Sequence, residues 1–161
     1  MTDPHRISVA LCTYNGAKYL AEQLDSIAAQ TLAPTEMIVC DDGSTDGTLG
    51  MVEHFASRAS FPVRLRSNAE NLGSTENFSR AIRACRGDVV ALADQDDVWL
   101  PQKLERIARA FETHPRAGVA FSDATVVDED LNPLGRLWET VGFTRAQQRR
   151  LARGRAAEVL V

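Results

Sequence analysis

The sequence has 161 residues, of which 44% are hydrophobic and 25% are charged, so it can bury the core of about one domain. Residues 1–140 carry 13 basic and 21 acidic side chains, a net charge of −8, which argues against a nucleic-acid partner. No stretch approaches the roughly 18–20 apolar residues of a membrane helix, and the polar residues 1–6 lead us to expect no signal peptide.

Apolar, β-rich runs alternate along the chain with segments of helical periodicity. We expect strands at residues 7–12, 37–40, 63–67, 89–93 and 118–127, and a chain reversal at residues 130–135. Expected helices cover residues 17–30, 48–57 and 75–85, and Pro101 suits the first turn of a fourth helix with the apolar stripe Leu104, Ile107, Ala108 and Phe111. This alternation predicts an α/β fold with a mostly parallel sheet covered by helices.

Polar residues follow each of the first four predicted strands, in the segments 13–16, 41–47, 68–73 and 94–97. In an open α/β sheet, ligands bind beyond the carboxyl ends of the strands, so these four loops are the expected binding site. The segment 94–97 places three carboxylates in four residues, and their mutual repulsion favours a bound cation. Mg²⁺ or Mn²⁺, completed by substrate phosphates, fits this chemistry. A solvated acidic turn is the alternative.

The loop after the second strand offers a further acceptor. Asp42 is placed to accept the N–H of a nucleotide base or a ribose hydroxyl. Residues 42–53 also match most of a calcium-binding EF-hand loop, but a short β-like run stands where that motif needs a helix. We expect Ser44, Thr45 or Asp46 to cap the helix that follows.

Four segments, in this order and spacing, resemble the motifs of the family 2 glycosyltransferases: residues 9–15, 38–46, 71–73 and 93–101. The last, with its Asp-x-Asp motif, is similar to that of rhamnosyltransferase-like members. The resemblance implies a GT-A (nucleotide-diphospho-sugar transferase) fold, a Rossmann-like, mostly parallel sheet with helices on both faces. It implies an inverting, metal-dependent transferase that moves sugar from a UDP- or dTDP-linked donor to a glycan or lipid-linked acceptor in cell-surface polysaccharide synthesis.

The resemblance also implies roles for individual residues near the nucleoside. Asp42 would hold the base, and Cys12, Thr13 and Tyr14 would line the base pocket.

Other residues would face the diphosphate and the sugar. Asp96 would ligate Mg²⁺ or Mn²⁺ directly, and Asp94 would meet the ribose or complete the metal shell. Asn71 and Gly73 would face the donor sugar, or else they only precede a helix capped by Ser74.

An inverting transfer needs a general base, which in this family lies well after the Asp-x-Asp motif. After Glu139 the only acid is Glu158, so we expect the base beyond Val161 and interpret residues 1–161 as a single donor-binding domain truncated before its acceptor region. Two alternatives are a sugar nucleotidyltransferase of similar fold and a non-catalytic nucleotide-binding module. The former needs a glycine-rich triphosphate loop, and segment 13–18 supplies one glycine.

The remaining features predict the surroundings of the protein. Cys12, Cys40 and Cys85 are interpreted as reduced core thiols of a cytoplasmic protein. Trp99 and Trp138 either pack or contact sugars. An exposed sheet edge could pair with a second copy. The arginines of the C-terminal segment form a solvated helix face or a peripheral membrane contact at the inner face of the membrane: Arg145, Arg149, Arg150, Arg153 and Arg155.

Overall fold

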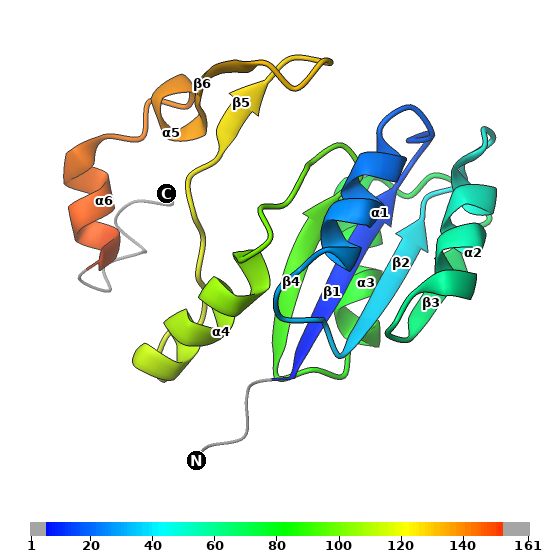
Figure 1. Cartoon of the computed structure of the whole chain (residues 1–161), viewed down its shortest axis with the longest axis horizontal. Helices are drawn as coiled ribbons and strands as arrows, with labels where there is room; N and C mark the ends of the chain where they lie inside the picture. The colour runs from blue at the N-terminus through cyan, green and yellow to red at the C-terminus, as the bar shows by residue number, and fades with distance from the viewer. Residues whose placement is uncertain (1–5, 153–161) are drawn as a thin grey trace. The chain divides into compact units, whose positions relative to one another are not determined.

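The computed structural model describes residues 6–152 (Figure 1). The chain divides into two compact units, residues 1–113 and 114–161. No helix among the described residues is long and apolar enough to cross a membrane.

The first unit is built on a four-stranded, fully parallel sheet with the strand order β3-β2-β1-β4. Its strands are β1 (Ile7–Thr13), β2 (Glu36–Asp41), β3 (Val63–Ser67) and β4 (Val89–Asp94). Its helices are α1 (Leu20–Ala28), α2 (Thr48–Arg58), α3 (Ser74–Ala84) and α4 (Lys103–Thr113). The predicted elements of this unit are confirmed, with ends that shift by up to three residues.

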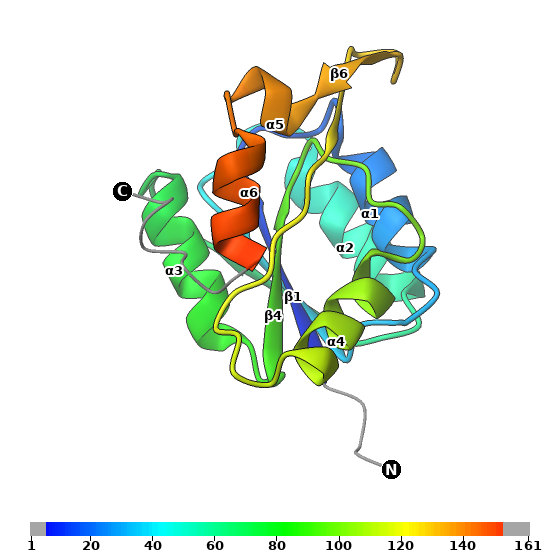
Figure 2. The ribbon, with the colours of Figure 1, turned by 90° about the vertical axis from the view of Figure 1, so that its left-hand side faces the viewer.

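The sheet is covered on both faces, as Figure 2 shows. Alternate residues of each strand face opposite sides, so each strand contributes to two cores. The larger core joins one face, with Val9, Leu11 and Val39, to residues of α1, α2 and α4. The smaller core joins the opposite face to α3, through Ala10, Cys12, Ile38, Cys40 and Ala81. Both faces of β1 and β2 are buried, which is why these strands read as continuous apolar runs.

The strand order places a topological switch point between β1 and β4. The chain steps from β1 to β2 to β3 in one direction and then crosses back to add β4 on the other side of β1. Cys12 of β1 lies in register with Asp94 of β4, so the carboxyl ends of both strands meet there. In open α/β sheets this crevice is where ligands bind.

Gly87 lies where the turn before β4 presses against the start of β1. Its N–H donates to Ser8 Oγ at 2.8 Å, and Arg6 O accepts the neighbouring N–H of Asp88 at 2.7 Å. A Cβ built on Gly87 would lie 2.5 Å from Arg6 O and 2.7 Å from Ser8 N, both backbone atoms that cannot swing away. Only glycine fits this contact.

Substitution of Gly87 by alanine is therefore expected to lower the free energy of unfolding by about 1–3 kcal/mol, because the backbone must shift to admit the methyl group. Gly50 of α2 is the matched control. A Cβ there meets no atom within 4 Å. We expect Gly50→Ala to raise stability by up to about 1 kcal/mol, since alanine is the better helix former. Urea unfolding of the two variants measures this, and equal stabilities would contradict the packing described.

The second unit holds a hairpin of β5 (Thr125–Val127) and β6 (Pro133–Arg136), followed by α5 (Leu137–Thr140) and α6 (Arg145–Ala152). The predicted chain reversal is confirmed, with Asp128 accepting the N–H groups of Asp130 and Asn132. The predicted strand over 118–127 is wrong in length. Residues 118–124 pair with no strand among the described residues, so their backbone N–H and C=O groups gain no ladder bonds.

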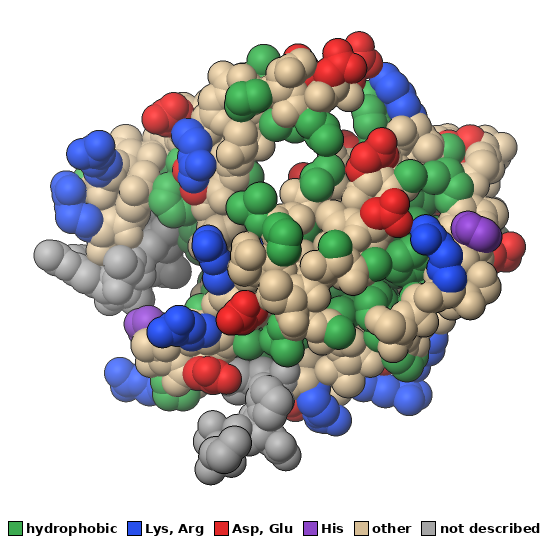
Figure 3. Space-filling model, viewed as in Figure 1, with side chains coloured by type: hydrophobic (Ala, Val, Ile, Leu, Met, Phe, Trp, Pro, Cys, Tyr) green, Lys and Arg blue, Asp and Glu red, His purple; other side chains and the backbone are tan. Residues whose placement is uncertain are grey.

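The polar surface of the described residues mixes both signs of charge. The face drawn in Figure 3 carries both acidic and basic side chains, with hydrophobic groups between them. Arg145, Arg149 and Arg150 lie in α6 and are exposed, whereas Arg153 and Arg155 lie outside the described residues. The predicted membrane contact and the predicted homodimer stay predictions.

Candidate functional site

The loops that follow β1 and β2 are held together by side-chain hydrogen bonds. Asp41 is fully buried and accepts Thr13 Oγ1 and Ser44 N, each at 2.8 Å. Asn15 N donates to Ser44 Oγ at 2.9 Å, and Asn15 Oδ1 accepts Thr45 N at 2.9 Å. These bonds place the two loops side by side at one edge of the sheet.

Of the three predicted capping residues, Asp46 binds the start of α2, although it lies one residue before the N-cap position. Gly47 is the N-cap of α2 and has no side chain to cap with. The carboxylate of Asp46, one residue earlier, accepts Thr48 N at 2.9 Å and Ala17 N at 3.1 Å. These bonds lower the pKa of Asp46, those with Thr48 contributing most. Asp46 thus ties α2 to the loop after β1.

Asp42 sits at the end of β2 with only 3% of its surface exposed. Its Oδ1 accepts Leu72 N at 2.9 Å and Asn68 Nδ2 at 2.8 Å, and its Oδ2 accepts Gly73 N at 2.8 Å. Burial raises the pKa of Asp42, but these three bonds and nearby Arg80 outweigh it, so the net shift is downward. A carboxylate has about four acceptor positions, and three are filled by the chain itself.

Asp42 and Asp94 both lie near the thiol of Cys12, on the sheet face that α3 covers. The pKa of Cys12 is raised to about 12, first by burial and then by the charges of Cys40, Asp94 and Asp42. The α3 helix packs on β1 and β2, while Leu92 of β4 on the same face remains 52% exposed. The β4 part of this face is therefore open beside the two carboxylates.

Thr13 and Tyr14 are placed differently from each other. Thr13 is buried, and its hydroxyl on Asp41 points to the α1 and α2 side of the sheet, away from Asp94; its carbonyl accepts Asp42 N at 2.8 Å. Tyr14 is exposed at the strand end. Of the predicted base-pocket side chains, the structure brings Cys12 to the face of Asp42 and Asp94 and directs Thr13 to the other.

The acidic segment 94–97 is anchored to the loop after β1 by Gln95. Its Oε1 accepts Tyr14 N at 2.8 Å, and its Nε2 donates to Tyr14 O at 3.1 Å. Gly16 leaves room for this clamp, since a Cβ there would lie 2.1 Å from Gln95 Oε1. Gln95 turns inward, whereas Asp94, Asp96 and Asp97 on either side are exposed.

The three carboxylates of this segment repel one another. Burial raises the pKa of Asp94, and the charges of Asp97 and Asp96 raise it further against the opposing effect of Lys103. The pKa of Asp97 is also raised, mainly by burial. Both shifts indicate a cluster that a cation would stabilise. Among the described residues no group of three or more His, Cys, Asp and Glu side chains is arranged to hold a metal.

Lys103 is the cation that the structure places beside this cluster. Its Nζ lies 4.1 Å from the centre of the Trp99 ring. Burial lowers its pKa more than Asp97 and Asp94 raise it. Trp99 itself is buried in the larger core, as the packing interpretation predicted, and Trp99 N donates to Ser26 Oγ at 3.0 Å. The Trp99 indole N–H has no partner among the described residues.

The segment before α3 is held by hydrogen bonds to Asp42, and no side chain caps the helix. Gly73 is the N-cap of α3, with φ of 84°, so the predicted cap at Ser74 is wrong. Gly73 N donates to Asn71 Oδ1 as well as to Asp42. Asn77 in the first turns of α3 is buried and donates to Cys40 O at 2.8 Å. Asn71 and Gly73 therefore border the site through the loop that Asp42 holds.

Sequence analysis missed the structural importance of Asp41, Gln95 and Lys103. A signal existed for each. Asp41 ends an apolar strand, Gln95 is the uncharged residue inside an acidic run, and Lys103 is the first basic residue after that run. None of these patterns says which partner the side chain takes, because the partners are distant in sequence.

The three cysteines are free thiols, as predicted. Burial raises the pKa of Cys12 to about 12 and of Cys85 to about 11, and it also raises that of Cys40. At pH 8 a thiol with a pKa near 11 is deprotonated in about one molecule in a thousand. We expect all three thiols to react slowly with Ellman's reagent in the native protein and quickly in denaturant. Rapid native reaction of one thiol would contradict the buried placement, and Cys85→Ser identifies whether the half-buried Cys85 is responsible.

Comparison with known protein families identifies the family of this chain. The family described as Glycosyl transferase family 2 matches residues 8–156, which span both units. The chain belongs to glycosyl transferase family 2. A family relative named as an uncharacterized glycosyltransferase of Nostoc is 38% identical over 114 residues, 71% of this chain and 35% of its own length. Chondroitin synthase of Escherichia coli is 30% identical over 127 residues, 78% of this chain and 18% of its own.

Solved structures of glycosyltransferases share the fold. Staphylococcus aureus TarS 1–349 in complex with UDP-GlcNAc has a TM-score of 0.63 and 27% identity over 76% of this chain and 40% of its own. A Pyrobaculum calidifontis mannosyltransferase in complex with GDP-Man and Mn²⁺ has a TM-score of 0.62 and 28% identity over 79% of this chain and 37% of its own. The predicted GT-A fold is confirmed. The chain spans less than half the length of these relatives, and the prediction of a single truncated domain stays a prediction.

Proposed function

We propose that this chain binds the donor of a family 2 glycosyltransferase, a nucleoside diphosphate sugar together with a divalent cation. One observation supports this most strongly. The carboxylates of Asp42 and Asp94 lie on the same face of the sheet, at the switch point between β1 and β4, beside the exposed Leu92 of β4. Family membership and neighbours solved with UDP, UDP-GlcNAc and GDP-Man agree with a nucleotide sugar there.

The nucleoside end of the donor is assigned to Asp42. Oδ1 already accepts two hydrogen bonds, whereas Oδ2 accepts only that of Gly73, so one acceptor position of Oδ2 remains for a base N–H or a ribose hydroxyl. The lowered pKa of Asp42 keeps this acceptor ionised at neutral pH. Cys12 forms the apolar floor between Asp42 and Asp94, and Tyr14 lies exposed at the rim.

The diphosphate end is assigned to the acidic segment. Asp96 and Asp94 are exposed oxygen donors of the type that Mg²⁺ and Mn²⁺ prefer. The pKa of Asp94 is raised first by partial burial and then by the charges of Asp97 and Asp96, and a cation would offset those charges. A cation held there would stabilise the negative charge that the departing nucleoside diphosphate gains. Gln95 makes two hydrogen bonds to the Tyr14 backbone, and these bonds restrain the segment that carries the two aspartates.

For the whole enzyme we extend the proposal to transfer of the sugar, with inversion, to a glycan or lipid-linked acceptor in surface polysaccharide synthesis. The expectation of a general base beyond Val161 belongs to this step and stays a prediction. Calorimetric titration of the chain with UDP, dTDP and GDP, each with and without Mn²⁺, tests the donor site. Metal-dependent binding of one nucleotide supports it. A folded chain that binds none of them would contradict it.

A further inference from the structure

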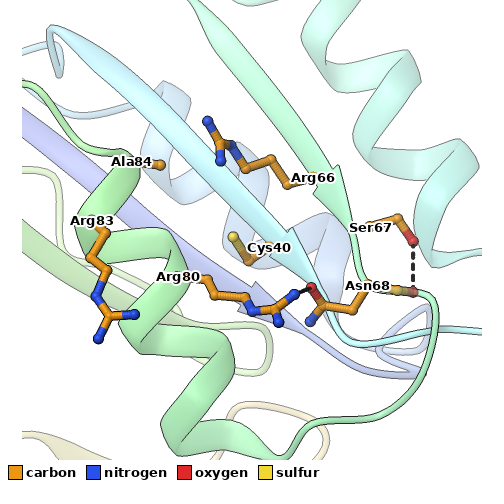
Figure 4. Close-up of a pocket in the computed structure, with 7 residues that line it drawn as sticks. All are labelled: Cys40, Arg66, Ser67, Asn68, Arg80, Arg83 and Ala84. Carbon is orange, nitrogen blue, oxygen red and sulfur yellow. Dashed lines mark hydrogen bonds between the residues drawn. The ribbon is translucent and has the colours of Figure 1, made fainter.

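A second polar concavity lies between β3 and α3, on the flank of α3 turned toward β3 (Figure 4). Its volume is about 630 Å³, within the range of roughly 300–1,000 Å³ typical of ligand pockets. The residues that line it include three arginines and no carboxylate: Cys40, Arg66, Ser67, Asn68, Arg80, Arg83 and Ala84. None of the proposed donor-binding residues is among them.

The three arginines belong to two elements, and the buried Cys40 lies at the bottom of the concavity. Arg66 comes from β3, and Arg80 and Arg83 come from α3. Cys40, only 1% exposed, lies at the floor, and Figure 4 shows Arg66 leaning over it while Arg80 reaches toward Asn68. Arg83 extends along the outside of α3. Burial raises the pKa of Cys40, and Arg66 and then Arg80 act against that rise, which places both cations near the same thiol.

The positive charge of this concavity is only partly balanced by the chain. Arg80 Nη1 donates to Asn68 Oδ1 at 3.0 Å, and Arg80 Nε makes a long contact of 3.4 Å with Glu76. Among the described residues no carboxylate forms an ion pair with Arg66 or Arg83. On the same face, by contrast, Arg64 of β3 pairs with the buried Glu36. Two guanidinium groups that share a pocket without a carboxylate favour an anionic guest.

We propose that the concavity lined by Arg66 and Arg80 binds a phosphate group, either free or as the phosphomonoester of a lipid headgroup. Planar guanidinium groups bind phosphate oxygens through paired N–H donors. A hydrogen-bond chain joins the site to the proposed donor site. Arg80 donates to Asn68, Asn68 donates to Asp42, and Asp42 accepts Gly73 N.

The alternative is that Arg66 only prevents the edge strand β3 from pairing with another molecule, as charged residues on edge strands do. The two interpretations differ in what phosphate does. In ¹⁵N NMR titrations at constant ionic strength, inorganic phosphate is expected to shift the backbone signals of Cys40, Asn68 and Gly73 saturably, and chloride is not. Arg66→Gln and Arg80→Gln should each weaken binding by about tenfold, the typical worth of a hydrogen bond to a charged group.

A second arm identifies the source of the phosphate. Vesicles of phosphatidylcholine with phosphatidic acid, compared with phosphatidylcholine alone, test the lipid headgroup by co-sedimentation. Arg106→Gln, an exposed arginine of α4, is the matched control and should change neither arm. Binding in either arm that depends on Arg66 and Arg80 supports the site. No saturable shift and no vesicle binding, or binding unchanged in both pocket variants, would overturn it.

Discussion

Replacement of Asp96 by alanine is expected to weaken metal-dependent nucleotide binding by roughly 100-fold or more, because even residues one step removed from a metal ion contribute about 10–100-fold to its affinity. Asp96 is exposed beside Asp94 and is the proposed direct ligand. With one carboxylate removed, Asp94 alone cannot bring the cation to the diphosphate. Calorimetric titration with the nucleotide that binds best, with Mn²⁺ and again after chelation with EDTA, measures the loss.

Glu112→Gln is the matched control, since it removes one negative charge from an exposed position of α4, away from the sheet edge. Its affinity should equal that of the unsubstituted chain. If Asp96→Ala still binds as tightly with Mn²⁺, Asp96 is not a ligand. If both variants lose affinity equally, the effect arises from overall charge and the proposed metal site is wrong.

Substitution of Asp42 by asparagine is expected to cost roughly 2–4 kcal/mol of stability, because a buried carboxylate that accepts three hydrogen bonds becomes a neutral amide that must turn one oxygen away from its donors. An NH₂ group replaces one of the two acceptor oxygens, so Leu72 N or Gly73 N then faces a donor instead of an acceptor. The loop between β3 and α3 loses its anchor, and we expect it to become more accessible to protease. Urea unfolding at pH 7 measures the change in the free energy of unfolding.

The same substitution should alter how stability depends on pH. The folded-state pKa of Asp42 lies below its unfolded value of about 3.9, so its contribution is complete above that value and is lost as the pH falls through the folded pKa. Acid should therefore destabilise the unsubstituted chain more than Asp42→Asn below about pH 4. Asp25→Asn is the control, because the exposed Asp25–Arg58 pair contributes at most about 1 kcal/mol. Identical acid profiles for all three proteins would contradict the role of Asp42.

The sequence predicted the first unit closely because its signals are local. Both faces of β1 and β2 are buried, so they appear as unbroken apolar runs, and the helices that cover them show a one-sided apolar stripe. The segment 118–127 was predicted as one strand on the same grounds, and this failed. An apolar run becomes a strand only where a neighbour takes its backbone hydrogen bonds, and among the described residues only 125–127 have one.

In the candidate site, too, local features were predictable from the sequence and long-range contacts were not. By itself the sequence determined the fold class, the family and the polar segments after each strand, because strand ends and motif spacing are written along the chain. Only the tertiary structure decided what each side chain contacts. The Thr13 hydroxyl binds Asp41 and points away from Asp94, and three acceptor positions of Asp42 bind N–H groups of the chain itself. Arg66 and Arg80 line the same pocket as Cys40. These contacts join residues far apart in sequence, and strand order and helix packing bring them together.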